Sequence, residues 1–340
     1  MARPQLELTS TLDKGGIEAT LSVLDDLAFI GYLEGSDLKR QPENPRFCKL
    51  LRSEDGGRSW SSPQLLEGDW GSIMPDAKII RLRDSGRLML SAWGFKGWLD
   101  RAGFETYVQV LVSDDDGQSF SLRSTIRKDP AVKSLAICNT SVIQMADGRL
   151  LAIMRGDAHK SGAFPYGLRS ISADEGRTWT PASPININIC EPRLLLDDGQ
   201  VLLLARSWPG NVNLWYRPLR EQEREPGSSQ IETLDAELRD DYQSPVREFG
   251  VMVFTTEDDG QTWRPVVTME NPRQPDLTHD MDILDRHRYQ AAYPDMVMLD
   301  DGGYLVAFRK PDPKIPNVRP GLTYSHVFQR FLAANIIARV

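Results

Sequence analysis

The chain has 340 residues, 40% of them hydrophobic, and its 40 basic and 48 acidic side chains give a formal net charge of −8. A chain of this size and apolar content can bury a substantial core. The acidic balance and the lack of dense Lys/Arg runs argue against nucleic-acid binding. With no apolar run of membrane-helix length and no signal-peptide core near Met1, we expect a cytoplasmic protein without a membrane partner.

The cysteines are odd in number and include no CxxC spacing: Cys48, Cys138 and Cys190. This pattern argues against a disulfide framework and against a zinc site. We therefore interpret the three cysteines as small buried residues within strands. No metal ion is expected.

In chain order, the first recognisable element is LSVLDDLAFIGYL around Asp26, in which two apolar strands flank an acidic turn. Clearer versions, with an Asp-Gly or Ser-Gly turn, surround four later glycines: Gly86, Gly148, Gly199 and Gly302. Asp-Gly between β-rich apolar runs is a strong signal for a hairpin. Each of these segments is therefore predicted to be an antiparallel strand pair.

A second motif alternates with these hairpins. It occurs four times as Ser/Thr-x-Asp-x-Gly-x-Ser/Thr-aromatic: SEDGGRSW (53–60), SDDDGQSF (113–120), SADEGRTW (172–179) and TEDDGQTW (256–263). The Asp carboxylate can accept backbone N–H bonds within the turn, and Gly can adopt the positive φ of a tight reversal. The repeated Asp residues are therefore expected to be structural: Asp55, Asp115, Asp174 and Asp258.

The alternation of two hairpin types indicates repeated four-stranded sheets, and we expect an all-β, six-bladed β-propeller forming a single domain over residues 1–340. The long interval from Gly199 to Gly302 is expected to hold the sixth blade, between Arg206 and Val251, unless both chain ends build it. Residues 217–245 are charged and contain Pro-Gly-Ser-Ser, which indicates an exposed insertion with a short helix. Residues 323–331 are predicted to be a last strand that joins the first sheet and closes the ring.

One strand position stands out when the hairpins are aligned. Seven residues after the turn glycines lie Trp93, Arg155, Arg206 and Arg309. Equivalent positions of successive blades converge, and the planar guanidinium binds carboxylates through two parallel bonds. The pattern favours an anionic small ligand, although surface ion pairs at strand ends would give the same pattern.

Polar residues also enter two otherwise apolar strands. Glu191 and Arg193 precede the Gly199 turn, and Tyr293 and Asp295 precede the Gly302 turn. Polar groups at the start of a buried strand are costly unless they are bonded or functional. These residues are therefore candidates for a site, with buried structural roles for Glu191 and Tyr293 as the alternative.

With these motifs, the chain resembles the sialidase (neuraminidase) superfamily over roughly Leu21 to Phe331. The resemblance implies a six-bladed propeller whose repeated turns lie away from the active site. Members of this family have a Glu before one hairpin turn and an Arg after it, and Glu191 and Arg206 match these two positions. The resemblance assigns a further Arg, ahead of a late repeat, to Arg247, and the nucleophilic Tyr near the C-terminus to Tyr293.

This chain departs from the family pattern at two places. The first strand lacks the family's Arg-Ile-Pro motif and has Ile17 or Glu18 in its place. The acid/base aspartate has three candidates: Asp37, Glu43 and Asp76. The missing arginine suggests a preference shifted from ordinary sialosides.

The resemblance implies a glycosidase that acts on a terminal acidic 2-keto sugar of a glycan without a cofactor. In it Tyr293 would attack, Glu191 would take the phenol proton, and Asp37 or Asp76 would protonate the leaving oxygen. Arg206 and Arg247 would hold the carboxylate, with Arg155 or Arg309 as a third arginine and Arg193 as a further contact. Another acidic-sugar hydrolase or lyase, such as a uronide enzyme, and a non-catalytic glycan- or protein-binding propeller stay open as alternatives.

Overall fold

A computed structural model gives the architecture of the chain. It describes twelve segments: residues 17–24, 27–33, 48–66, 72–75, 79–96, 105–127, 136–157, 167–208, 245–246, 250–270, 292–311 and 324–332. The expected helix within 217–245 lies outside these segments.

The described residues contain twenty β-strands. Those of the first half are β1 (Ile17–Leu24), β2 (Leu27–Leu33), β3 (Cys48–Ser53), β4 (Gln64–Leu66), β5 (Ser72–Pro75), β6 (Ile80–Arg81), β7 (Leu88–Lys96), β8 (Glu105–Ser113), β9 (Ser121–Ile126) and β10 (Ala136–Gln144). Those of the second half are β11 (Leu150–Asp157), β12 (Gly167–Ser172), β13 (Ser183–Pro184), β14 (Asn188–Asp197), β15 (Gln200–Trp208), β16 (Gly250–Thr255), β17 (Arg264–Glu270), β18 (Ala292–Met298), β19 (Gly303–Pro311) and β20 (Tyr324–Leu332).

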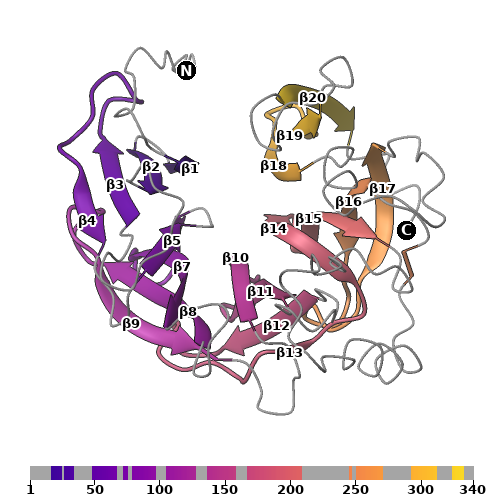
Figure 1. Cartoon of the computed structure of the whole chain (residues 1–340), viewed down its shortest axis with the longest axis horizontal. Coiled ribbons are helices and arrows are strands. Elements are labelled where there is room, and N and C mark those ends of the chain that lie inside the picture. The colour runs from indigo at the N-terminus through magenta and orange to yellow at the C-terminus, as the bar shows by residue number, and fades with distance from the viewer. Residues whose placement is uncertain are drawn as a thin grey trace, which may run out of the picture. The chain divides into compact units, whose positions relative to one another are not determined.

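The strands form five consecutive sheets in chain order (Figure 1). Three sheets have the order β1-β2-β3-β4, β10-β11-β12-β13 and β14-β15-β16-β17. A fourth runs β5-β7-β8-β9, with β6 paired to β7, and the last is β18-β19-β20. Sequential four-stranded antiparallel sheets are the blades of a β-propeller, so the all-β propeller prediction is confirmed.

The prediction of six blades is wrong for the part of the chain that the structure describes. That part has four complete blades and one three-stranded sheet. The sixth blade was expected between Arg206 and Val251, yet these two residues are direct partners on β15 and β16. The intervening residues are therefore an insertion within one blade. The C-terminal strand β20 pairs with β19 rather than with the first sheet.

Two compact units divide the chain. One comprises residues 1–132, 136–152 and 170–183, and the other residues 133–135, 153–169 and 184–340. In the first unit, apolar side chains of β2, β3, β7 and β8 fill the space between the first two sheets: Leu27, Phe29, Leu50, Leu88, Leu90 and Leu111. In the second unit, β15, β16, β18 and β19 contribute another core: Leu202, Leu204, Val251, Val253, Met296, Val306 and Phe308. Burial of such side chains holds neighbouring blades together.

The hairpin turns follow the predicted chemistry. The four turn glycines have positive φ, from 71° at Gly86 to 90° at Gly148. Backbone hydrogen bonds across each turn join its two ends, such as the bond from Met145 N–H to Arg149 O at 2.8 Å. Turn glycines in the left-handed region let the strands reverse within a few residues.

The repeated octapeptides are likewise turns held by their own side chains. In the second copy, Asp115 accepts the Ser119 amide at 2.9 Å and the Ser113 hydroxyl at 2.7 Å, while the Gly117 amide donates to Ser113 Oγ at 2.8 Å. Hydrogen bonds from Ser119, then from Ser113, lower the pKa of Asp115 to about 2 against a slight opposing effect of burial. The same bonds recur in the other three copies, which confirms the structural role of Asp55, Asp174 and Asp258.

Candidate functional site

A buried ion pair joins the first two strands of the fourth blade. Glu191 lies on β14 and Arg206 on β15, and Arg206 Nη2 donates to Glu191 Oε1 at 3.4 Å. Their side chains are only 6% and 8% exposed, respectively. Two of the residues that the sequence proposed for one site are therefore in direct contact.

An irregular backbone positions Glu191. Cys190 pairs with Arg206 and Arg193 with Leu204, so three steps along β14 match two along β15. This extra residue is a β-bulge, and it changes which face of the sheet the following side chains occupy. Glu191 itself has φ 55°, in the left-handed region that costs a residue with a Cβ about 1–2 kcal/mol. A buried, charged and strained residue costs stability, as functional residues often do.

The surroundings of the pair are cationic. Burial would lower the pKa of the Arg206 guanidinium, but Glu191 and Cys190 together outweigh it and raise this pKa, against a smaller opposing effect of Arg155. Burial also raises the pKa of the neighbouring Cys190 thiol, partly offset by Arg155 and Arg206. Two guanidinium groups and one carboxylate thus interact here, together with a neutral thiol.

The bulge of β14 recurs at the equivalent place on β18. Ala292 pairs with Arg309 and Asp295 with Ala307, so the extra residue falls at Tyr293 or Pro294. Tyr293 therefore occupies on β18 the register position that Glu191 occupies on β14. Within their unit, β14 and β18 pack against one another. The backbone thus places Glu191 and Tyr293 at matching points of two neighbouring strands, while the Tyr293 side chain lies outside the described part.

Of the other described candidates, two make hydrogen bonds to neighbouring backbone groups, and for the third the structure gives only the position in its strand. Arg193 donates to the carbonyl of Pro192 at 2.9 Å. Asp295 accepts the Met296 amide at 2.8 Å. Arg309 is placed by register opposite Ala292, as Arg206 is opposite Cys190. The aligned arginine positions on β15 and β19 are therefore equivalent, as the spacing predicted.

The remaining candidates lie outside the described residues, and their predictions stay untested: Asp37, Glu43, Asp76 and Arg247. Glu18 is placed only as part of β1, where a bulge between Ile17 and Thr20 repeats the irregularity of β14.

Sequence reasoning missed the bulge. Its signal is a polar residue six positions before the residue at which the hairpin turn begins, as Glu191 is before Asp197 and Tyr293 is before Leu299. Asn139 stands at the same distance before Met145, and it also has positive φ, at 40°. A polar residue with positive φ therefore recurs at this position of β10 and β14.

Over the described segments, no group of three or more His, Cys, Asp or Glu side chains is arranged to hold a metal ion. The same segments contain no helix with the length and hydropathy needed to span a bilayer. All three cysteines are buried thiols within β3, β10 and β14, as predicted.

Comparison with known proteins shows which family the chain is similar to. Residues 52–217 match the BNR repeat-like domain. Over these residues the chain is similar to the sialidase/BNR superfamily. A sialidase of Micromonospora viridifaciens is 24% identical over 212 residues, which cover 55% of this chain and 32% of that protein. The chain thus corresponds to about a third of that superfamily member's length.

Solved structures share the fold. A protein of unknown function from Dyadobacter fermentans matches 93% of this chain and 76% of its own, with 18% identity and a TM-score of 0.60. A Hadza microbial sialidase, Hz136, matches 90% of this chain and 57% of its own, with 17% identity and a TM-score of 0.53. At these identities the likeness concerns the propeller fold alone.

Proposed function

We propose that the protein is a sialidase-like glycoside hydrolase that removes a terminal acidic 2-keto sugar from a glycan. The observation that carries this proposal is the buried Glu191–Arg206 pair, held 3.4 Å apart at a strained bulge. The match to the BNR repeat-like domain and the similarity to a sialidase support it. Function depends on the site rather than on the scaffold, so the proposal is stated through individual residues.

Tyr293 is the proposed nucleophile and Glu191 its base. The anomeric carbon of a 2-keto acid sugar carries a carboxylate, which would repel an anionic nucleophile. A neutral phenol avoids this repulsion if a neighbouring carboxylate takes its proton as it attacks. The matching bulges of β14 and β18 support this pairing, because they give the two residues equivalent positions on packed strands.

The arginines are proposed to hold the substrate carboxylate. Arg206 is already buried beside Glu191, and Arg155 contributes to the electrostatic environment of the same pair. A guanidinium binds a carboxylate through two parallel hydrogen bonds, and such contacts are strong where water is excluded. Arg247 and Arg309 are the further members of this proposed clamp, with Arg193 at its edge.

The last role is the acid that protonates the leaving oxygen, for which Asp37 and Asp76 are the proposed residues. The C–O bond to the aglycone breaks, its electron pair goes to the oxygen, and the acid supplies the proton. The covalent glycosyl–tyrosine is then hydrolysed by water with the same groups acting in reverse.

The test is a panel of sialosides, their deaminated analogues and uronides, read as kcat/KM because discrimination is a ratio of those values. We expect turnover of a 2-keto acid glycoside, loss of most of it in Tyr293→Phe and Glu191→Gln, and near-normal turnover in Tyr304→Phe. Tyr304 is a suitable control because it lies on the same sheet and donates its hydroxyl to Asp197 instead. Turnover of uronides alone would replace the proposal with a uronide enzyme. A folded protein that acts on nothing in the panel would contradict catalysis and favour a binding propeller.

A further inference from the structure

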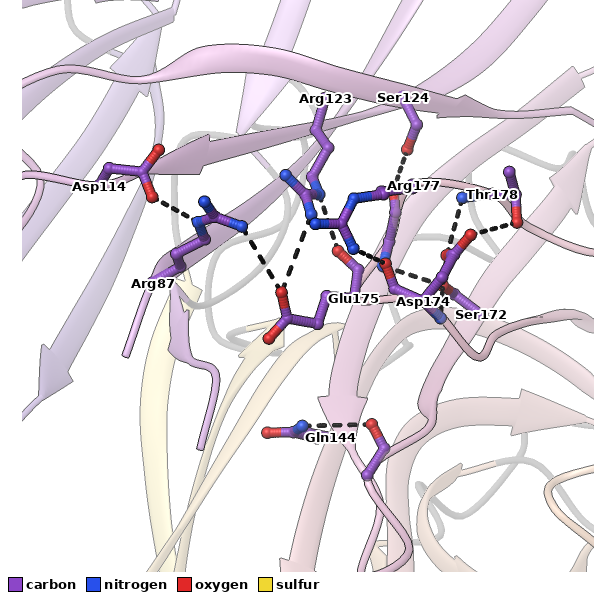
Figure 2. Close-up of polar contacts among 12 residues, drawn as sticks. Arg87, Asp114, Arg123, Ser124, Gln144, Ser172, Asp174, Glu175, Arg177 and Thr178 are labelled. Carbon is purple, nitrogen blue, oxygen red and sulfur yellow. Dashed lines mark hydrogen bonds and ion pairs between the residues drawn. The ribbon is translucent and has the colours of Figure 1, made fainter. Parts of the chain in front are cut away.

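A cluster of three arginines lies at the turns of the second and third blades. Arg87 follows the Gly86 turn, Arg123 lies on β9, and Arg177 belongs to the third repeated octapeptide. Figure 2 shows the three side chains gathered around Glu175. All of these residues belong to one compact unit.

Two carboxylates contact the cluster. Arg87 Nε donates to Asp114 Oδ1, and Arg87 Nη1 lies 3.6 Å from Glu175 Oε2. Arg123 Nη2 lies 3.8 Å from the same oxygen. These last two distances are those of ion pairs and exceed a hydrogen bond. Among the described residues, the Glu175 carboxylate therefore attracts the arginines without a hydrogen bond from any of them.

Arg123 has unused donor capacity. Its Nε donates to the Glu175 carbonyl at 2.9 Å, but its Nη2 is buried and has no hydrogen-bond partner in the described part of the chain. A buried donor without an acceptor is costly. Burial first, and then the charges of Arg177 and Arg87, lower the pKa of the Arg123 guanidinium. The three cations thus repel one another more than their acidic neighbours compensate at Arg123.

The link from Arg123 to Glu175 is itself a repeated structural feature. Arg52, on the first blade, donates in the same way from Nε to the carbonyl of Asp116 at 2.7 Å, and its Nη1 is bonded to Glu54. This feature explains one bond of Arg123. It does not explain why Arg87 and Arg177 converge on the same place.

Arg177 completes the arrangement. Its Nη1 donates to the backbone oxygen of Asp174 at 3.2 Å, while the Asp174 carboxylate is occupied by Ser172 and Thr178. The remaining N–H groups of Arg177 are therefore available to a ligand. Since Arg177 is exposed and the Glu175 side chain is 21% exposed, solvent reaches the cluster.

We propose that Arg87, Arg123 and Arg177 form a binding site for a tetrahedral oxyanion, a sulfate or phosphate group. Its oxygens would accept N–H bonds from the three guanidinium groups at the position that the Glu175 carboxylate approaches only at 3.6–3.8 Å. Guanidinium groups bind such groups through paired hydrogen bonds. The ligand is either a free ion or a sulfate carried by a glycan, and this site is independent of the proposed hydrolytic activity.

The experiment is a titration followed by 15N NMR of arginine side-chain Nε–H signals, with sodium chloride used to hold the ionic strength constant. The probes are inorganic sulfate, inorganic phosphate and galactose 6-sulfate, with galactose as the uncharged control. We expect saturable shifts of the Arg87 and Arg123 signals. If galactose 6-sulfate binds more tightly than sulfate, the source is a glycan, and the reverse order identifies the free ion.

The variants make the test specific. Arg177→Gln should raise the Kd about tenfold, the value of one charged hydrogen bond. Arg58→Gln is the matched control, because Arg58 makes the equivalent bond to the Asp55 carbonyl in the first octapeptide at 2.9 Å. It should leave the Kd unchanged, and Glu175→Gln should lower it by removing the competing charge. Unsaturable shifts, or equal effects of Arg177→Gln and Arg58→Gln, would overturn the proposal.

Discussion

Arg206 and Glu191 form a buried contact of 3.4 Å across β14 and β15, at the point where β14 carries an extra residue. Charged pairs of this kind contribute little net stability, because desolvation of both groups cancels most of their attraction. Removal of one partner is far more costly, since the other charge stays buried. The pair is therefore better explained by a role in a site than by a role in folding.

The first prediction concerns this ion pair. Arg206→Met should lower the free energy of unfolding by about 3–5 kcal/mol, because it leaves the Glu191 carboxylate buried without its partner. Urea denaturation measures the change. Arg149→Met, at an exposed pair with Asp147, should cost less than about 1 kcal/mol. The double variant Arg206→Met/Glu191→Gln should be more stable than Arg206→Met alone. If it were not, the charges of Glu191 and Arg206 would not be coupled.

The second prediction concerns the backbone of Glu191. Glycine adopts the left-handed region without strain, so Glu191→Gly should be more stable than Glu191→Ala by about 1–2 kcal/mol. Both variants lose the same ion pair, and their difference therefore reports the backbone alone. At Ser121, an exposed position of β9, the order should reverse, because glycine weakens an ordinary strand. Greater stability of the alanine variant at position 191 as well would mean that Glu191 is unstrained.

The third prediction concerns acid stability. Bonds from Ser119 and Ser113 lower the pKa of Asp115 from 3.8 to about 2. At Asp174, burial opposes ionisation, but bonds from Thr178 and Ser172 together outweigh it and lower the pKa to about 2. A carboxyl with a lower folded pKa stabilises the fold above its unfolded pKa, and this stability disappears as pH falls through the folded pKa. The free energy of unfolding should therefore drop between about pH 4 and pH 2. Asp115→Asn should make that slope shallower, and an unchanged slope would contradict the role of Asp115.

A fourth prediction arises from Gln109, which is fully buried on β8. Both of its amide atoms lack hydrogen-bond partners within the described segments. Gln109→Met, similar in shape, should therefore raise the free energy of unfolding by about 1–3 kcal/mol. Gln144→Met should lower it instead, because the Gln144 carbonyl accepts the Arg83 amide at 2.7 Å. A loss of stability in both variants would show that the Gln109 amide is satisfied.

The fifth prediction tests how a repeated octapeptide packs on the preceding blade. A Cβ at Gly117 would overlap the ring of Phe29, whereas a Cβ at Gly86 would meet no atom within 4 Å. Both residues have positive φ, so alanine should cost about 1–2 kcal/mol at either position. The overlap should add about 1–3 kcal/mol at Gly117. Thermal unfolding of the two variants provides the comparison, and equal losses would contradict close packing against Phe29.

Much of the fold was predictable from local patterns. The Asp-Gly turns and the octapeptides define their hairpins through short-range bonds, such as those of Ser113 and Ser119 to Asp115. The number of blades was not predictable, because the length between Arg206 and Val251 is the same for an insertion as for an extra blade. Only the direct pairing of these two residues distinguishes the two cases.

The sequence alone determined the repeat, the turn chemistry and the pairing of Glu191 with Arg206 as candidates, since each depends on residues close in the chain or equivalent in the repeat. The tertiary structure decided where those side chains lie. One extra residue between Cys190 and Arg193 places Glu191 in the left-handed region and against Arg206. It also decided that Arg87 and Arg123 lie at ion-pair distance from Glu175, with Arg177 beside them (Figure 2). Register and contacts between blades depend on long-range packing, which local sequence does not encode.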